Sequence, residues 1–179
     1  MFAIRKQRTY TPDMHLKPQD LAAAIKFALA GAQTYDQLAA SLAISKSEAH
    51  AAVKRAKAAG LVLADRQPNR QGLLEFLIHG VRYAFPADRG RQVRGMPTAH
   101  AAPPLSAHIH LGTEPPPVWP DPKGDVRGES FSPLYPGAPA AARADLKLYQ
   151  CLSLIDAIRG GRARERNLAA SMLTELLDG

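Results

Sequence analysis

The sequence predicts a mainly α-helical fold, in which a small helical domain is followed by a Pro-rich extended segment and a C-terminal helical hairpin. Three observations support this prediction. Apolar residues recur at helical spacing between residues 17 and 59. Ten of the 15 prolines in the 179-residue chain lie between Pro103 and Pro139, which excludes long helices there. Helical spacing then returns between residues 146 and 177.

The composition is that of an ordinary globular protein, with 46% hydrophobic and 22% charged residues. No apolar run is long enough for a transmembrane helix, and the N-terminus lacks the apolar core of a signal peptide. Cys151 is the only cysteine, so an internal disulfide and a Cys-based zinc site are excluded. We therefore expect a cytoplasmic protein that has no contact with membranes.

The first helix is expected to begin at Lys17. Pro18 suits the first helical position, where its missing N–H is not needed. Leu21, Ile25 and Leu29 then recur every four residues and form one apolar face. Gly31 follows at the position where glycine commonly ends a helix.

Two short helices with matching N-terminal signals follow. Thr34 and Gln37 fit a capping box, in which the two side chains satisfy each other's backbone N–H groups. Ser45 and Glu48 repeat that pattern for the next helix. Gly60 ends this third helix, and residues 61–64 are expected to form a short strand.

The third helix has two different faces. Ala49, Val53 and Ala56 form an inward apolar stripe. Its polar and basic residues fall largely on the other side, and these are Lys46, Ser47, His50, Lys54 and Lys57. Two short helices separated by about three residues, the second of them basic on its outer face, are typical of a helix-turn-helix.

The charge distribution supports this interpretation. The net charge is +7, of which residues 1–70 carry +6, residues 71–142 carry none and residues 143–179 carry +1. A basic domain attached to a neutral remainder is typical of a module that binds a polyanion. On charge alone, a solvated basic face with no partner is an equal alternative.

Residues 34–49 and the ending Ala58-Ala59-Gly60-Leu61-Val62 resemble the winged helix-turn-helix domains of MarR-type bacterial transcriptional regulators. The resemblance covers about 50 residues. It implies that Lys46, Ser47, His50 and Lys54 enter the major groove of double-stranded DNA. Arg55 on the same helix is added to this predicted set. The next position after His50 is Ala51, which cannot make a bidentate hydrogen-bond pair with a base.

The wing that the resemblance implies is expected to be short. Arg66 and Arg70 lie in a segment with turn chemistry, where they would reach a flanking minor groove or the DNA backbone, or simply be solvated. A second wing strand is missing, because apolar residues from Leu73 to Ala84 have helical spacing. We therefore expect a helix there, capped near Asn69.

The chain is predicted to have four parts: a basic N-terminal tail (1–16), the winged helix-turn-helix (17–85), the Pro-rich segment (86–142) and the hairpin (143–179). In the Pro-rich segment, Val118, Trp119, Val126, Phe131, Leu134 and Tyr135 are expected to anchor it by packing. Residues 121–125 suggest a turn between two short strands. Residues 94–100 suggest a shaped loop, which would line an effector pocket or pack on the helical domain.

The C-terminal hairpin is expected to break at Gly160 and Gly161. Its apolar surface must be covered, and it therefore packs either against its own domain or against a second copy of the chain in a homodimer. Arginines gather near its turn, and these are Arg159, Arg162, Arg164 and Arg166. Because Asp156 and Glu165 dilute their charge, we favour a solvated face over phosphate contact.

The sequence gives little support for a metal site or for catalysis. His79, His100, His108 and His110 make a metal site conceivable, but no cysteine or carboxylate has a supporting spacing, so no metal or cofactor is predicted. No glycine-rich phosphate loop, nucleophile with a base or carboxylate pair indicates an enzyme.

The function that the sequence predicts is a DNA-binding transcriptional regulator, most simply a homodimeric repressor. One alternative is an antitoxin-like or other protein-interaction regulator that binds a partner protein through residues 103–179. The other alternative is a ligand- or metal-responsive sensor.

Overall fold

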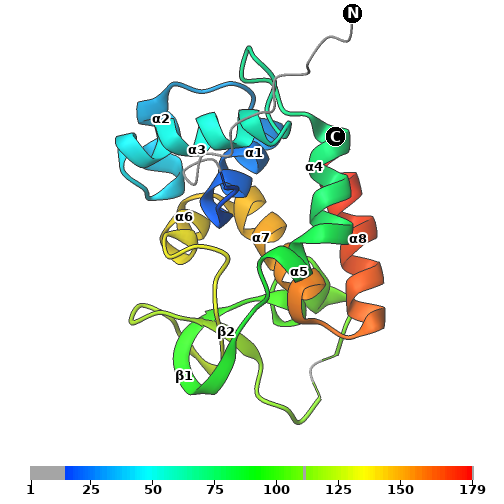
Figure 1. Cartoon of the computed structure of the whole chain (residues 1–179). Coiled ribbons are helices and arrows are strands. Elements are labelled where there is room, and N and C mark those ends of the chain that lie inside the picture. Colours follow the sequence, from blue (N-terminus) through cyan, green and yellow to red (C-terminus); the bar gives the residue numbers. More distant parts are fainter. Residues whose placement is uncertain (1–14, 111, 179) are drawn as a thin grey trace, which may run out of the picture.

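The computed structural model describes residues 15–110 and 112–178, and its fold is mainly α-helical, as predicted (Figure 1). The predicted basic tail lies outside the described residues apart from His15 and Leu16. Within the described part of the chain, none of the helices has the length and apolar character needed to cross a membrane.

The three predicted N-terminal helices are present as α1 (Pro18–Ala30), α2 (Tyr35–Leu42) and α3 (Lys46–Ala58). The capping box of α2 is complete, because Gln37 N–H donates to Thr34 Oγ1 and Thr34 N–H donates to Gln37 Oε1. At α3 only half of the predicted box forms. Ser45 Oγ accepts from the Glu48 N–H, but the Glu48 side chain turns inward to Arg55.

The segment after α3 is a small hairpin rather than the expected strand over residues 61–64. Its only ladder pair is the antiparallel bridge between Val62 and Pro68. Leu63 N–H donates to the Gln67 carbonyl at 2.8 Å and closes the turn. The expected strand is thus reduced to a single bridged position in this hairpin.

The helix expected over residues 73–84 is present and begins slightly earlier. It consists of α4 (Arg70–Glu75), a π-helical turn (Phe76–Gly80) and α5 (Val81–Ala84). Asn69 caps it, as predicted, because its Oδ1 accepts from the Gly72 N–H.

The Pro-rich segment contains a three-stranded closed barrel made of β1 (Arg89–Pro97), β2 (Pro117–Pro120) and β3 (Val126–Phe131). Strands β2 and β3 are the two predicted around the turn at residues 121–125, whereas β1 was not predicted. β1 pairs antiparallel with both other strands, and β2 pairs parallel with β3. Two glycines permit this tight closure: a Cβ on Gly95 would lie 2.1 Å from the Trp119 carbonyl oxygen, and one on Gly128 would lie 2.0 Å from that of Pro116.

The C-terminal hairpin is formed by α7 (Leu146–Gly160) and α8 (Ala163–Asp178), and the unpredicted short helix α6 (Ala138–Ala144) precedes it. Every residue from Cys151 to Arg159 is buried. The helix α7 contacts α1, α5, α6 and α8, and α8 also lies beside α4 (Figure 1). The hairpin therefore packs on its own chain, which is one of the two possibilities that the sequence left open.

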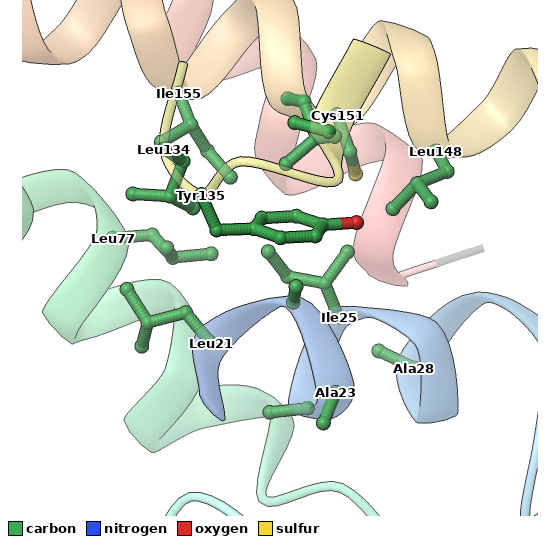
Figure 2. Close-up of a cluster of buried hydrophobic side chains, with 14 of the residues drawn as sticks. Leu21, Ala23, Ile25, Ala28, Leu77, Leu134, Tyr135, Leu148, Cys151 and Ile155 are labelled. Carbon is green, nitrogen blue, oxygen red and sulfur yellow. The ribbon is translucent and has the colours of Figure 1, made fainter. Parts of the chain in front are cut away.

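One hydrophobic core joins the helical domain, the Pro-rich segment and the hairpin, with members from Leu21 to Leu177. Figure 2 shows Tyr135 lying between α1 and the C-terminal helices, close to Ile25 and Cys151. Among the predicted anchors, all but the half-buried Val126 are buried. Burial, with a smaller contribution from Asp145, raises the pKa of Cys151 to about 12, so this thiol is a packing group.

The interpretation of Asp156 and Arg159 as part of a solvated face is wrong, because both residues are buried. Asp156 accepts hydrogen bonds from Thr98 Oγ1 (2.7 Å), Trp119 Nε1 (2.6 Å) and Arg159 Nη1 (2.6 Å). Arg159 also donates to the backbone carbonyl oxygens of Phe85, Pro86 and Ser132. Burial raises the pKa of Asp156, and Arg159, Thr98 and Trp119 act against that shift.

Replacing Tyr135 by phenylalanine is expected to stabilise the fold. The side chain is 2% exposed, and its hydroxyl has no hydrogen-bond partner among the described residues. Removing an unsatisfied buried hydroxyl should gain about 1 kcal/mol, which corresponds to a rise in Tm of about 2–4 °C at this chain length. Thermal unfolding would measure the shift, with Tyr83→Phe, at a tyrosine 75% exposed, as the matched control. A lower Tm for Tyr135→Phe than for the control would mean that the hydroxyl is bonded in solution.

Candidate nucleic-acid interface

The turn between α2 and α3 is short and tightly held. Ala43 ends α2 in the left-handed region, with φ of 53°. Ile44 and Ser45 complete the turn, and Ser45 caps α3. Gly137 packs directly on it, because a Cβ there would lie 2.8 Å from the carbonyl oxygens of both Leu42 and Ala43. The Pro-rich segment thus supports the turn that sets the direction of α3.

One face of α3 is exposed and carries the residues that the sequence singled out. The side chains of Lys46, Ser47, His50 and Lys54 are all exposed. The opposite face is buried through Ala49, Val53 and Ala56, as predicted. Ala51 lies half-buried within the exposed side and adds no hydrogen-bonding group to it.

An aromatic stack fixes the position of His50. Its ring lies on the ring of Tyr35, with centroids 3.5 Å apart and an interplanar angle of 26°. The guanidinium of Arg66 also lies over the Tyr35 ring, 5.2 Å from its centroid. Tyr35 was not identified from the sequence, since a lone aromatic in the first turn of a helix gives no signal of such a contact. The stack connects α2, α3 and the small hairpin.

The two lysines of the exposed face differ in their pairing. Lys46 Nζ lies 2.9 Å from Asp36 Oδ2 in an ion pair that is largely exposed. Such a pair contributes little to stability, and an incoming anion can compete with it. Lys54 has no ion pair or hydrogen bond with any residue that the structure describes. Lys54 is therefore the freest cation on this helix.

The assignment of Arg55 to the DNA-binding set is corrected. Arg55 is 6% exposed, and its Nε and Nη2 donate to the two carboxylate oxygens of Asp20 at 2.8 and 2.7 Å. Asp20 is fully buried in α1, and Glu48 accepts a further hydrogen bond from Nη2. Hydrogen bonding to Asp20 is the main cause that raises the pKa of Arg55. This arginine joins α1 to α3 and faces away from the exposed side.

The two predicted wing arginines make contacts within the fold. Arg66 is half-buried and donates from Nη1 to the Gln33 carbonyl at 2.9 Å. Arg70 is exposed, but its terminal nitrogens donate to carbonyl oxygens of Ala28 in α1 and Leu177 in α8. Since both ends of its guanidinium are engaged, Arg70 serves to join two helix C-termini, and we do not retain it among the candidate DNA contacts.

Of the four histidines considered for metal binding, His100 and His110 line the same cavity. In the ranges 15–110 and 112–178, however, no group of three or more His, Cys, Asp or Glu side chains could hold a metal ion. The cavity has a volume of about 530 Å³, and Arg89, Glu114, Arg162 and Glu165 are among its other lining residues. His100 Nδ1 is 3.6 Å from Glu165 Oε2. The loop predicted over residues 94–100 is instead the end of β1 and a short 3-10 turn, and of these residues only His100 lines the cavity.

Comparison of the chain with protein-family models, curated proteins and solved structures found no significant match. The geometry of α2, α3 and the hairpin that follows them is therefore the basis for assigning a function.

Proposed function

We propose that this protein is a DNA-binding transcriptional regulator of the winged helix-turn-helix type, with α3 as its recognition helix. The observation that carries the proposal is the exposed face of α3, on which Lys46, Ser47, His50 and Lys54 stand free of the core. The short hairpin over residues 61–69 takes the place of the wing. A homodimer would present two copies of α3 to half-sites roughly 34 Å apart.

The chemistry of this face suits a duplex. Cationic Lys46 and Lys54 can neutralise phosphates, while Ser47 and His50 can reach base edges. Stacking on Tyr35 fixes the His50 ring before binding, which lowers the entropy lost on association. Glu48 does not oppose the approach of DNA, because its carboxylate is bonded to Arg55 and Gln19. Few side chains can read bases, so phosphate contacts should supply most of the affinity.

Replacing both Lys46 and Lys54 by glutamine is expected to weaken duplex binding about tenfold at moderate salt. Each lost phosphate contact lowers the dependence of log K on log salt concentration by about 0.9, so the slope should fall by about 2. The measurement is fluorescence anisotropy with a labelled duplex selected from genomic fragments that the protein retains.

The matched control is Lys147→Gln, which removes an exposed charge at the start of α7. Affinity and slope should both stay close to those of the unaltered protein. Equal binding by the α3 variant and the control would show that α3 is not the DNA-binding element.

A further inference from the structure

Two arginines of the barrel lie directly opposite each other in the sheet. Arg94 on β1 and Arg127 on β3 are paired in the antiparallel register, so their side chains emerge side by side on one face. Both are exposed, and neither side chain has an ion pair, hydrogen bond or ring contact with any described residue. Like charges at directly opposed positions destabilise a sheet, so this pair opposes folding.

The surroundings add to the positive charge. Arg91 occupies the irregularity between Gly90 and Gln92, where β1 carries one extra residue, and it is exposed without a partner. A bulge of this kind redirects a side chain out of the regular ladder. Lys123 is exposed in the turn between β2 and β3, and this turn lies beside Arg94 because Asp121 N–H donates to the Arg94 carbonyl at 3.2 Å.

Nearby carboxylates do not compensate these cations. Asp121 is buried and paired with Arg143, and Glu129 is paired with Arg89. Asp125, exposed in the same turn, is the one carboxylate of this surface without a partner among the described residues. Arg94 and Arg127, with Lys123 in the adjoining turn, therefore form a basic barrel surface that keeps most of its charge. Arg91 lines a separate hollow with Glu114 and Glu129.

We infer that this basic barrel surface binds the sugar-phosphate backbone of double-stranded DNA, as a second contact separate from α3, which lies at the other end of the fold (Figure 1). Arginine pairs suit phosphate oxygens, which accept charge-assisted hydrogen bonds from the guanidinium fork. The exposed large hydrophobic side chains of the described chain are Leu63, Tyr83 and Leu146, and none lies in the barrel. The surface thus lacks the apolar centre of a protein-protein interface and the aromatic platform on which single strands stack.

This inference rests on the proposed function. It explains why the sheet keeps the destabilising repulsion between Arg94 and Arg127, which the fold itself does not require. Contacts to phosphates carry no sequence information, so the barrel would add affinity and fix the orientation of the protein on the duplex. That contribution would compensate for the few base-reading groups on α3.

The test is the full-length double variant Arg94→Gln/Arg127→Gln, measured with a mixed-sequence duplex about two helical turns long over about 50–200 mM salt. Affinity should fall about tenfold, and the salt slope should decrease by about 2. Because the like-charge repulsion is removed, Tm should rise by about 1–3 °C. Weaker DNA binding in a more stable protein is the combination that a merely structural role would not produce.

Two further double variants separate this inference from the proposed function. Lys147→Gln/Arg164→Gln removes two exposed, unpartnered charges elsewhere and is the charge-matched control, while Lys46→Gln/Lys54→Gln tests α3. If the barrel variant binds like the control, or its Tm falls, the inference is overturned and the role of α3 stands. If the barrel variant is weakened but the α3 variant is not, the barrel is supported and α3 is overturned. If the unaltered protein does not bind the duplex, both are overturned.

Discussion

Replacing Asp156 by alanine is expected to cost the fold about 5 kcal/mol or more, which approaches the whole stability of an ordinary domain. The substitution leaves the buried Thr98 hydroxyl and Trp119 indole N–H without their acceptor, and it removes the carboxylate that compensates the charge of the buried Arg159. These donors come from the end of β1, from β2 and from α7. Their loss should therefore detach the barrel from the central helix.

Trp119 provides the measurement, because it is the only tryptophan in the chain and is fully buried beside Asp156. Its fluorescence should report unfolding in urea at a much lower midpoint, or an exposed indole without denaturant. Asp88→Ala is the control, because this carboxylate is exposed and has no side-chain partner among the described residues. A midpoint equal to that of the control would contradict the network.

Asp156→Asn gives a graded version of the same experiment. Thr98 and Trp119 donate to Oδ2, whereas Arg159 donates to Oδ1. An asparagine can keep its carbonyl oxygen toward Thr98 and Trp119 and loses only the acceptor for Arg159. Its loss of stability should be clearly smaller than that of alanine, which keeps the hypothesis testable if Asp156→Ala does not fold.

Replacing Arg55 by alanine is the second change expected to have a large effect, of about 3–5 kcal/mol in the free energy of unfolding. It leaves the fully buried Asp20 without the bidentate partner that compensates its charge. Burial already raises the pKa of Asp20, and removing Arg55 should raise it further. Urea unfolding at neutral pH measures the loss.

The pH dependence of this variant has a definite sign. A carboxyl group with a raised pKa in the folded state destabilises the fold when it is ionised, so the penalty is full above the folded-state pKa. It decreases as the pH falls toward the unfolded value of about 3.9, because the folded protein then binds the proton first. The Arg55→Ala variant should therefore recover part of its deficit between neutral and mildly acidic pH.

The neighbouring Lys54→Ala variant is the matched control, because it lies on the same helix but is exposed. It should change stability by less than about 0.5 kcal/mol. The double variant Asp20→Asn/Arg55→Met should recover much of the stability, since it removes the uncompensated charge. An Arg55→Ala protein as stable as the Lys54→Ala protein would show that Arg55 is not a structural residue.

The helices were predictable because their signals are local. Thr34, Ser45 and Asn69 act on backbone N–H groups within the next three residues. The strand β1 was missed for the opposite reason. Its nine residues contain Gly90, Gly95 and Pro97, which disfavour a strand locally, and only the close approach of β2 explains why Gly95 is required.

The exposed face of α3 could likewise be identified from the sequence, because helical periodicity alone separates Lys46, Ser47, His50 and Lys54 from the buried alanines. Arg55 could not be assigned, since its partner Asp20 lies 35 residues away and nothing local shows that pairing. Asp156 and Arg159 pair with each other three residues apart, but their burial depends on remote partners such as Thr98 and Trp119, which nothing local indicates.

The sequence by itself determined the mainly helical class, the capped helices and the basic face of α3, because propensity, capping and periodicity act over a few residues. Only the tertiary structure decided which charged side chains are free at the surface and which are paired within the fold. A charge is stable in the core only beside a partner that can come from anywhere in the chain, and here Asp20 with Arg55 and Asp156 with Arg159 meet that condition. Among the cations whose side chains have no partner in the described chain, Lys54 on α3 and Arg94 with Arg127 on the barrel are those we expect to meet DNA.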